Sequence, residues 1–144
     1  MFNPSRDDAR RFFFATWRKH QTHESLTDLE RITLAILLAH PEYHAVLEQP
    51  EHYLTHDWHP EDGATNPFLH WSMHLSIEEQ LSIDQPHGLR ALYQRLCERY
   101  GEVHSAQHAV MDGLAEMIWQ AQRSASEPDP TVYLNCLRRQ LGEN

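Results

Sequence analysis

The sequence predicts an all-α protein, a compact helical bundle of about six or seven helices, and three observations support this expectation. Leu, Ala, Glu, Gln and Arg, which favour helices, fill the segments between turn signals. Val and Ile are sparse and rarely alternate with polar residues as they would along a strand. Only five of the 144 residues are glycine. Because 40% of the residues are hydrophobic, enough for one core, residues 1–144 are expected to form a single domain.

Start and stop signals place the first helices along the chain. Residues 3–5 (Asn-Pro-Ser), followed by two aspartates, start a helix that runs to about residue 20. The Thr27-Asp28 pair caps a second helix. Pro41 ends or kinks this helix, because the residue before a proline is pushed out of the α region. A short helix is then expected from Pro41 to about residue 54, where Pro50 is a further break signal.

The second half of the chain begins after the longest expected loop, residues 56–65. Asn66 as N-cap, with Pro67 at the first helical position, starts a helix that runs to about Ile83. Three further helices are expected at about residues 89–100, 103–123 and 130–141. Gly101 is expected to close the first of these three.

Pairs of histidines four residues apart are the distinguishing feature of the sequence. Twelve histidines in 144 residues would give about one such pair by chance, and a separation of four is one helical turn. The chain has four pairs, which are His40 with His44, His52 with His56, His70 with His74, and His104 with His108. Two imidazoles at this spacing share a helix face and can hold one metal ion.

Two of the four pairs are predicted to face inward. A helical wheel puts His70 and His74 on the arc of Ile77 and Leu81, with Glu78 extending the stripe. The same wheel puts the second inward pair, His104 and His108, near the apolar residues Met111, Ala115 and Trp119. Asp112 adds a carboxylate one turn further along this stripe. The loop histidines His52, His56 and His59 are expected to be solvated.

A buried imidazole or carboxylate needs a partner, and a metal ion is one such partner inside a bundle. We therefore predict a divalent metal site, with iron, zinc or manganese as the ion, while the excess of nitrogen ligands also keeps nickel and copper(II) open. His40 and His44 are secondary candidates, because Pro41 interrupts their helix. The predicted ligands are His70, His74, Glu78, His104, His108, Asp112, His40 and His44.

The strings at residues 66–80 (NPFLHWSMHLSIEEQ), 40–44 (HPEYH) and 104–123 (HSAQHAVMDGLAEMIWQAQR) resemble a family of short bacterial helical proteins known only as a domain of unknown function. The resemblance covers nearly the whole chain and implies no mechanism. A looser architectural likeness is to hemerythrin-like and DinB-like metal bundles. The chain departs from these, because their ligand spacings differ and a Glu-x-x-His motif is absent.

Several functions stay open beside a metal-dependent enzyme, sensor or carrier. Trp58 and the run Phe12 to Phe14 are candidate contacts of a non-catalytic protein-interaction module. Histidines that become charged between pH 5 and 7 also fit a pH switch. No Ser-His-Asp or Cys-His arrangement and no glycine-rich phosphate loop can be proposed.

Composition narrows the partners and the compartment. A net charge of -9 argues against nucleic acid. No apolar run reaches the roughly 18 residues of a membrane span, and the first residues lack the basic region and long apolar run that are typical of a signal peptide. Cys97 and Cys136 indicate no disulfide framework and no thiolate zinc site. We expect a cytoplasmic protein without nucleic-acid or membrane partners, and a protein partner or a homo-oligomer stays open.

Overall fold

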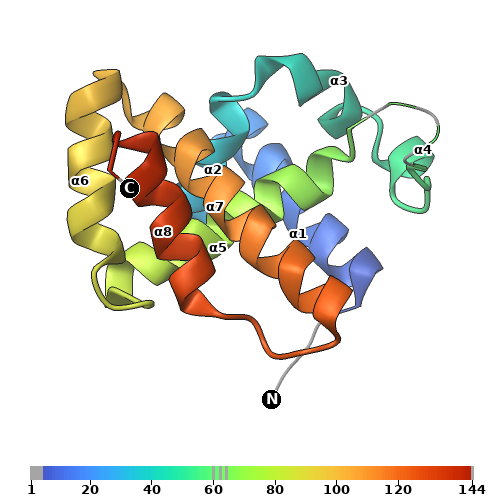
Figure 1. The fold of residues 1–144 in the computed structure, drawn as a ribbon. Helices are drawn as coiled ribbons and strands as arrows, with labels where there is room; N and C mark the ends of the chain where they lie inside the picture. Colours follow the sequence, from blue (N-terminus) through green and yellow to red (C-terminus); the bar gives the residue numbers. More distant parts are fainter. Residues whose placement is uncertain (1–4, 60, 62, 64, 144) are drawn as a thin grey trace. The chain divides into compact units, whose positions relative to one another are not determined.

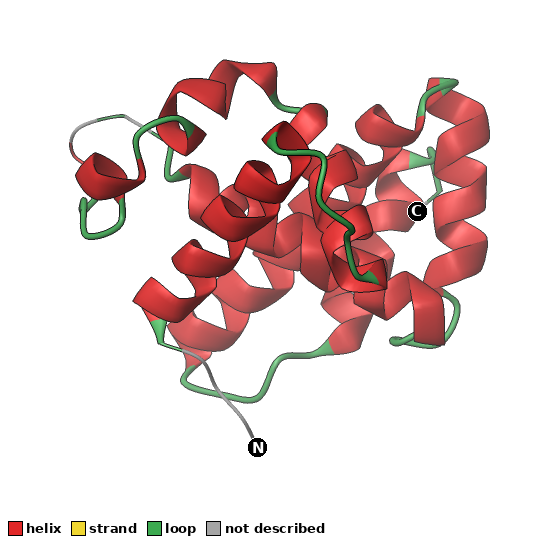
Figure 2. Ribbon diagram, turned by 180° about the vertical axis from the view of Figure 1, so that it is seen from behind, coloured by secondary structure: helices red, strands yellow, loops and turns green. Residues whose placement is uncertain are grey.

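The computed structural model describes residues 5–59, 61, 63 and 65–143, and these residues form an all-α protein. Figure 2 shows helices and loops and no strand among them. The described residues contain eight α-helices and one short 3-10 helix, so the all-α prediction is confirmed and the number of helices is larger than expected. By contact density the chain divides into a first unit, Met1–Leu75, and a second unit, Ser76–Asn144. None of the described helices combines the length and the apolar character that a membrane span needs.

The first unit begins with two capped helices, α1 (Arg6–Gln21) and α2 (Asp28–Leu38). Ser5 Oγ accepts a hydrogen bond from the Asp8 backbone N–H at 3.1 Å. Thr27 and Glu30 form a capping box in which each side chain accepts from the other's backbone N–H. The predicted starts of both helices are thus confirmed, while Asn3 and Pro4 lie outside the described residues.

The expected helix over residues 41–54 is broken into three pieces. They are η1 (Pro41–Tyr43), α3 (His44–Leu47) and α4 (Pro50–Tyr53). The break between η1 and α3, at Tyr43, does not precede a proline. The starts of η1 and α4 do follow a residue that precedes a proline: His40 adopts φ -125° and ψ 64°, and Gln49 adopts φ -130° and ψ 64°. Steric exclusion of the α region before proline explains both.

The core of the first unit is rich in aromatic rings, and α1 packs against α2 and α3 around it (Figure 1). Phe13 contacts Phe68 and Trp71, with ring centroids 6.2 Å and 5.4 Å apart. Rings at these separations add to the free energy gained by burying their area. The buried core residues are Phe13, Trp17, Ile36, Leu37, Leu47, Phe68 and Trp71.

The helix α5 (Pro67–Ile83) contains the boundary between the two units. Asn66 Oδ1 accepts from the backbone N–H groups of Phe68 and Leu69, so the predicted N-cap is confirmed. The part of the longest expected loop that is described, residues 56–59, 61, 63 and 65, precedes this cap; Pro60, Asp62 and Ala64 lie outside the described residues.

The second unit contains α6 (Leu89–Tyr100), α7 (Val103–Ser124) and α8 (Pro130–Gln140), with α7 packed against α6 and α8 (Figure 1). Gly113 allows the close approach of α7 and α8, because a Cβ there would lie 3.1 Å from side-chain atoms of both Tyr133 and Leu137. Gly101 ends α6 with φ 69°, as predicted.

Candidate metal site

His70 and His74 lie one turn apart on α5, and their ring centroids are 4.9 Å apart. His74 is 1% exposed and His70 is half-buried. Ile77, on the same arc, is fully buried. The predicted inward arc is therefore buried at His74 and Ile77 and only partly buried at His70.

His40 reaches the same place from the end of α2. Its Nδ1 lies 2.7 Å from the carbonyl oxygen of Ile36. A carbonyl oxygen only accepts, so Nδ1 carries the proton and donates it. In the neutral ring Nε2 then holds the lone pair. His40 is 2% exposed, so the fold buries an imidazole whose Nε2 carries the lone pair.

Three imidazoles thus form one cluster, the three-histidine cluster of His40, His70 and His74. The His40 ring centroid is 4.7 Å from that of His70 and 4.8 Å from that of His74. The Nε2 atoms of His40 and His70 are 3.0 Å apart. Two nitrogens that each lie about 2.05 Å from one ion are about 2.9 Å apart at about 90° and about 3.3 Å apart at the tetrahedral angle. The observed separation falls within that range.

The aromatic ring of Tyr43 contacts the three-histidine cluster, and Trp71 packs behind it. Tyr43 stacks on His40 with centroids 6.0 Å apart and meets His70 edge-on at 6.1 Å. Trp71, which is fully buried, lies 6.0 Å from Tyr43. Such rings keep water away from the imidazoles and lower the local dielectric constant, which strengthens any bond to a cation.

His44 is placed differently from His40, although both were candidates. Its Nε2 lies 2.8 Å from the carbonyl oxygen of Leu37, so Nε2 donates a proton there. Its ring lies 4.5 Å from that of Trp17. His44 therefore caps the last turn of α2 and packs on the core, with its Nε2 already used.

The second unit holds the other predicted pair. His104 and His108, on α7, have ring centroids 4.2 Å apart, and each offers a ring nitrogen within 4.8 Å of the other. Both are half-buried. The predicted apolar stripe holds at Met111, which is buried, but it is wrong further along, because Ala115 is exposed and Trp119 is 52% exposed.

The two predicted carboxylates of the second unit have other surroundings. Asp112 is exposed. Glu78 is half-buried and accepts a short hydrogen bond from the Gln107 amide. Tyr93 lies near Glu78 and Gln107. Burial, and to a smaller extent the hydrogen bond to Cys97, raises the pKa of the Tyr93 phenol to about 12. Cys97 and Cys136 are free thiols.

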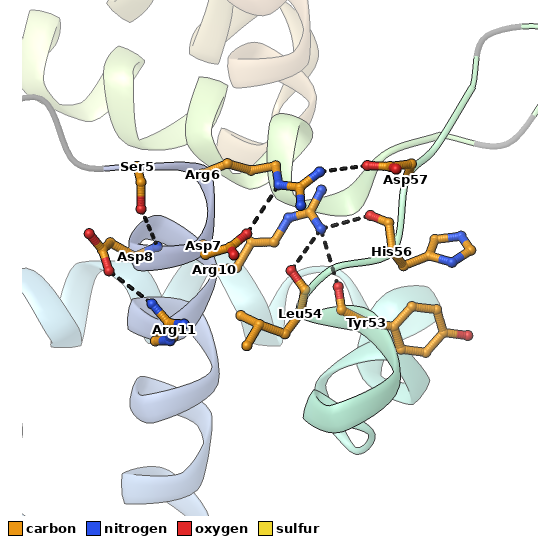
Figure 3. Close-up of polar contacts among 10 residues, drawn as sticks. All are labelled: Ser5, Arg6, Asp7, Asp8, Arg10, Arg11, Tyr53, Leu54, His56 and Asp57. Atoms are coloured by element: carbon orange, nitrogen blue, oxygen red, sulfur yellow. Dashed lines mark hydrogen bonds and ion pairs between the residues drawn. The ribbon is translucent and has the colours of Figure 1, made fainter.

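Around the remaining pair, His52 and His56, a buried arginine organises the chain (Figure 3). Arg10 is 3% exposed, and its Nη1 donates to the carbonyl oxygens of Tyr53, Leu54 and His56 at 3.2, 3.0 and 2.7 Å. Burial, and then the nearby Arg6, lower the Arg10 pKa. The side chains of His52, His56 and His59 are exposed, as predicted.

The aromatic residues named as candidate partner contacts pack within the first unit. Trp58 is half-buried, with its ring 5.5 Å from Phe68 and 5.2 Å from the Arg10 guanidinium. Phe13 is buried and Phe14 is half-buried against Phe68.

Sequence reasoning missed the groups that contact and orient the imidazoles: the Tyr43 ring and the carbonyl groups of Ile36 and Leu37. For His40, the sequence offered one signal of its position: it is a histidine that precedes a proline at the end of a helix. The backbone acceptors had no signal, because every residue carries a carbonyl group.

Residues 5–139 match the model of a family described as "Domain of unknown function (DUF1841)". No curated protein matches the chain, and no solved structure does. The likeness to hemerythrin-like and DinB-like bundles therefore stays a prediction.

Proposed function

The chain belongs to the DUF1841 family, whose description assigns no activity, and we propose from its own residues that it binds a divalent transition-metal ion. The carrying observation is the three-histidine cluster: three imidazoles from two segments, with two Nε2 atoms 3.0 Å apart. Neutral imidazoles are strong ligands for such ions. The hydrogen bond from His40 to the Ile36 carbonyl supports the proposal, because metal-binding histidines in proteins almost always donate their other ring N–H in this way.

The proposed ligand set favours zinc among the ions that the sequence left open. It consists of nitrogen donors, and zinc accepts imidazole in a tetrahedral shell, whereas manganese prefers oxygen ligands. Glu78 and Asp112 are left out of the set, because one is hydrogen-bonded to Gln107 and the other is exposed. His44 is left out because its Nε2 donates to Leu37.

Within the second unit, we propose His104 and His108 as a separate candidate pair of metal ligands. They repeat the spacing of His70 and His74 on a continuous helix, and their ring nitrogens lie within 4.8 Å of each other. When bound, a zinc ion would act as a Lewis acid or hold the ligating segments together. The residues of the chain would bind and orient it, and the Tyr43 ring covers His40 and His70.

Metal analysis of untagged protein tests this function. We expect close to stoichiometric metal after purification without added ions, measured by inductively coupled plasma mass spectrometry. The variant His40→Gln/His74→Gln should lose the metal of the three-histidine cluster, and His104→Gln/His108→Gln tests the pair of the second unit separately. Protein that stays metal-free after dialysis against zinc at micromolar concentration would reject the proposal.

A further inference from the structure

Two rings of the three-histidine cluster, those of His40 and His70, also form a hydrogen bond with each other. His40 donates its Nδ1–H to Ile36, so its Nε2 accepts from a donor 3.0 Å away, the Nε2–H of His70. Both rings are neutral in this arrangement. The buried imidazoles of His40 and His70 therefore make a hydrogen bond with each other where a bound ion would make two metal–nitrogen bonds.

Sites built from thiolates or carboxylates behave differently when they lose the ion. Their ligands carry negative charges that repel one another, and burying such charges without a cation is costly. Many such domains unfold without metal. Neutral imidazoles carry no such charge, and the aromatic packing of Tyr43 and Trp71 does not depend on an ion.

We infer that this site is built for reversible occupancy: the chain stays folded without metal, held at the site by the His40–His70 hydrogen bond, and exchanges that bond for coordination. The inference rests on the proposed function and deepens it, because it makes the protein an exchangeable metal carrier or sensor rather than a protein with a structural metal.

The exchange balances without net proton release. When the ion enters, the Nε2 proton of His70 leaves to solvent, and a solvent proton binds Nδ1 of the same ring. His70 stays neutral and changes tautomer. His40 keeps its proton on Nδ1, where the Ile36 carbonyl holds it in both states. His40 is thus the fixed ligand and His70 the switching one.

Two measurements on the full chain test this inference. After treatment with a chelator, circular dichroism should show a helical protein with a cooperative thermal transition. Two-bond 15N–1H spectra of the imidazoles should show His40 protonated on Nδ1 and His70 on Nε2. After addition of one equivalent of zinc, His70 should be protonated on Nδ1 and His40 unchanged.

A matched pair of variants separates packing from hydrogen bonding. In His70→Gln the amide can still donate to His40, so the metal-free melting temperature should stay within a few degrees of the parent while zinc binding is lost. In His70→Leu the donor is absent, and the melting temperature should fall further.

Each result decides one idea. Zinc binding together with a metal-free chain that lacks a cooperative transition, or with His70 protonated on Nδ1 before zinc is added, would overturn reversible occupancy and leave the proposed function standing. Failure to bind zinc would overturn the proposed function and, with it, reversible occupancy. The metal-free spectra would then still show whether the His40–His70 hydrogen bond forms.

Discussion

Two histidine pairs of the first unit have the same spacing and different surroundings. His70 and His74 lie on the seventeen-residue helix α5, and His74 is fully covered. His52 lies in the four-residue helix α4, His56 lies beyond its end, and both are exposed. Spacing alone therefore does not decide whether a histidine pair is buried: the pair on the continuous helix α5 is covered beside a third imidazole, and the pair at the short helix α4 is exposed to water.

His40 and His44 sharpen this lesson within a single segment. Each ring donates one proton to a carbonyl group at the end of α2. His40 uses Nδ1 for this and keeps Nε2 for the three-histidine cluster, whereas His44 uses Nε2. Which ring nitrogen the backbone takes decides which histidine can act as an Nε2 ligand.

The largest expected effect is on metal affinity. His40→Ala/His74→Ala should lower zinc affinity by on the order of 1,000-fold, since loss of groups that merely orient a ligand already costs roughly 10- to 100-fold. The matched variant His52→Ala/His56→Ala should leave affinity unchanged. Competition with a zinc-binding dye measures both, and equal losses would break the distinction between the two pairs.

Removal of the buried Trp71 ring should lower the free energy of unfolding more than any other change proposed below. Trp71→Ala leaves a cavity in the core and should lower the free energy of unfolding by about 3–5 kcal/mol. Trp71→Phe should cost much less, because it keeps a ring and the Trp71 indole N–H has no hydrogen-bond partner among the described residues. Urea unfolding gives both values, and similar losses in the two variants would show that the ring does not pack as described.

Arg10→Met should destabilise the segment around His52 and His56 without affecting the three-histidine cluster. It removes a buried guanidinium with three backbone acceptors, at a cost of about 2–3 kcal/mol. Zinc affinity should stay unchanged while proteolysis after residue 53 becomes faster. Arg11→Met, which removes only an exposed ion pair with Asp8, is the control. A parallel fall in zinc affinity would show that the two regions are coupled.

The smallest effect concerns the start of α2, the helix whose end carries His40. The Thr27 backbone N–H and then Lys19 hold the pKa of Glu30 below its ordinary value of 4.5. A carboxyl with a lowered folded-state pKa stabilises the fold above its unfolded-state pKa, and this contribution is lost as pH falls through the folded value. Glu30→Gln should thus be less stable than the parent at pH 7.

The difference between Glu30→Gln and the parent should shrink as the pH falls below about 4.5 and disappear once Glu30 is protonated in both states. Chemical unfolding at pH 7, 4 and 3 checks this. A difference independent of pH would show that the carboxylate charge is not what stabilises the capping box.

Local signals in the sequence predicted the fold well where they were strong. The predicted Thr27 cap, Asn66 cap and Gly101 stop are all observed, since each depends on neighbours along the chain. The break at Gln49 was harder to place, because Pro50 can also start a helix. The exposure of Trp119 could not be read from a helical wheel, which shows a shared face but not how far along the helix that face is covered.

The site was predicted in part for the same reason. His70 and His74 followed from periodicity on one helix. The role of His40 depended on which ring nitrogen the Ile36 carbonyl accepts from, a contact set by tertiary packing that spacing does not encode.

Anomalous diffraction at the zinc edge, from a crystal of the full chain grown with zinc, tests the central claim most directly. A peak is predicted about 2.0–2.1 Å from the Nε2 atoms of both His40 and His70, with His74 as a further ligand. A peak at His52 and His56 instead, or no peak at the three-histidine cluster, would contradict the account.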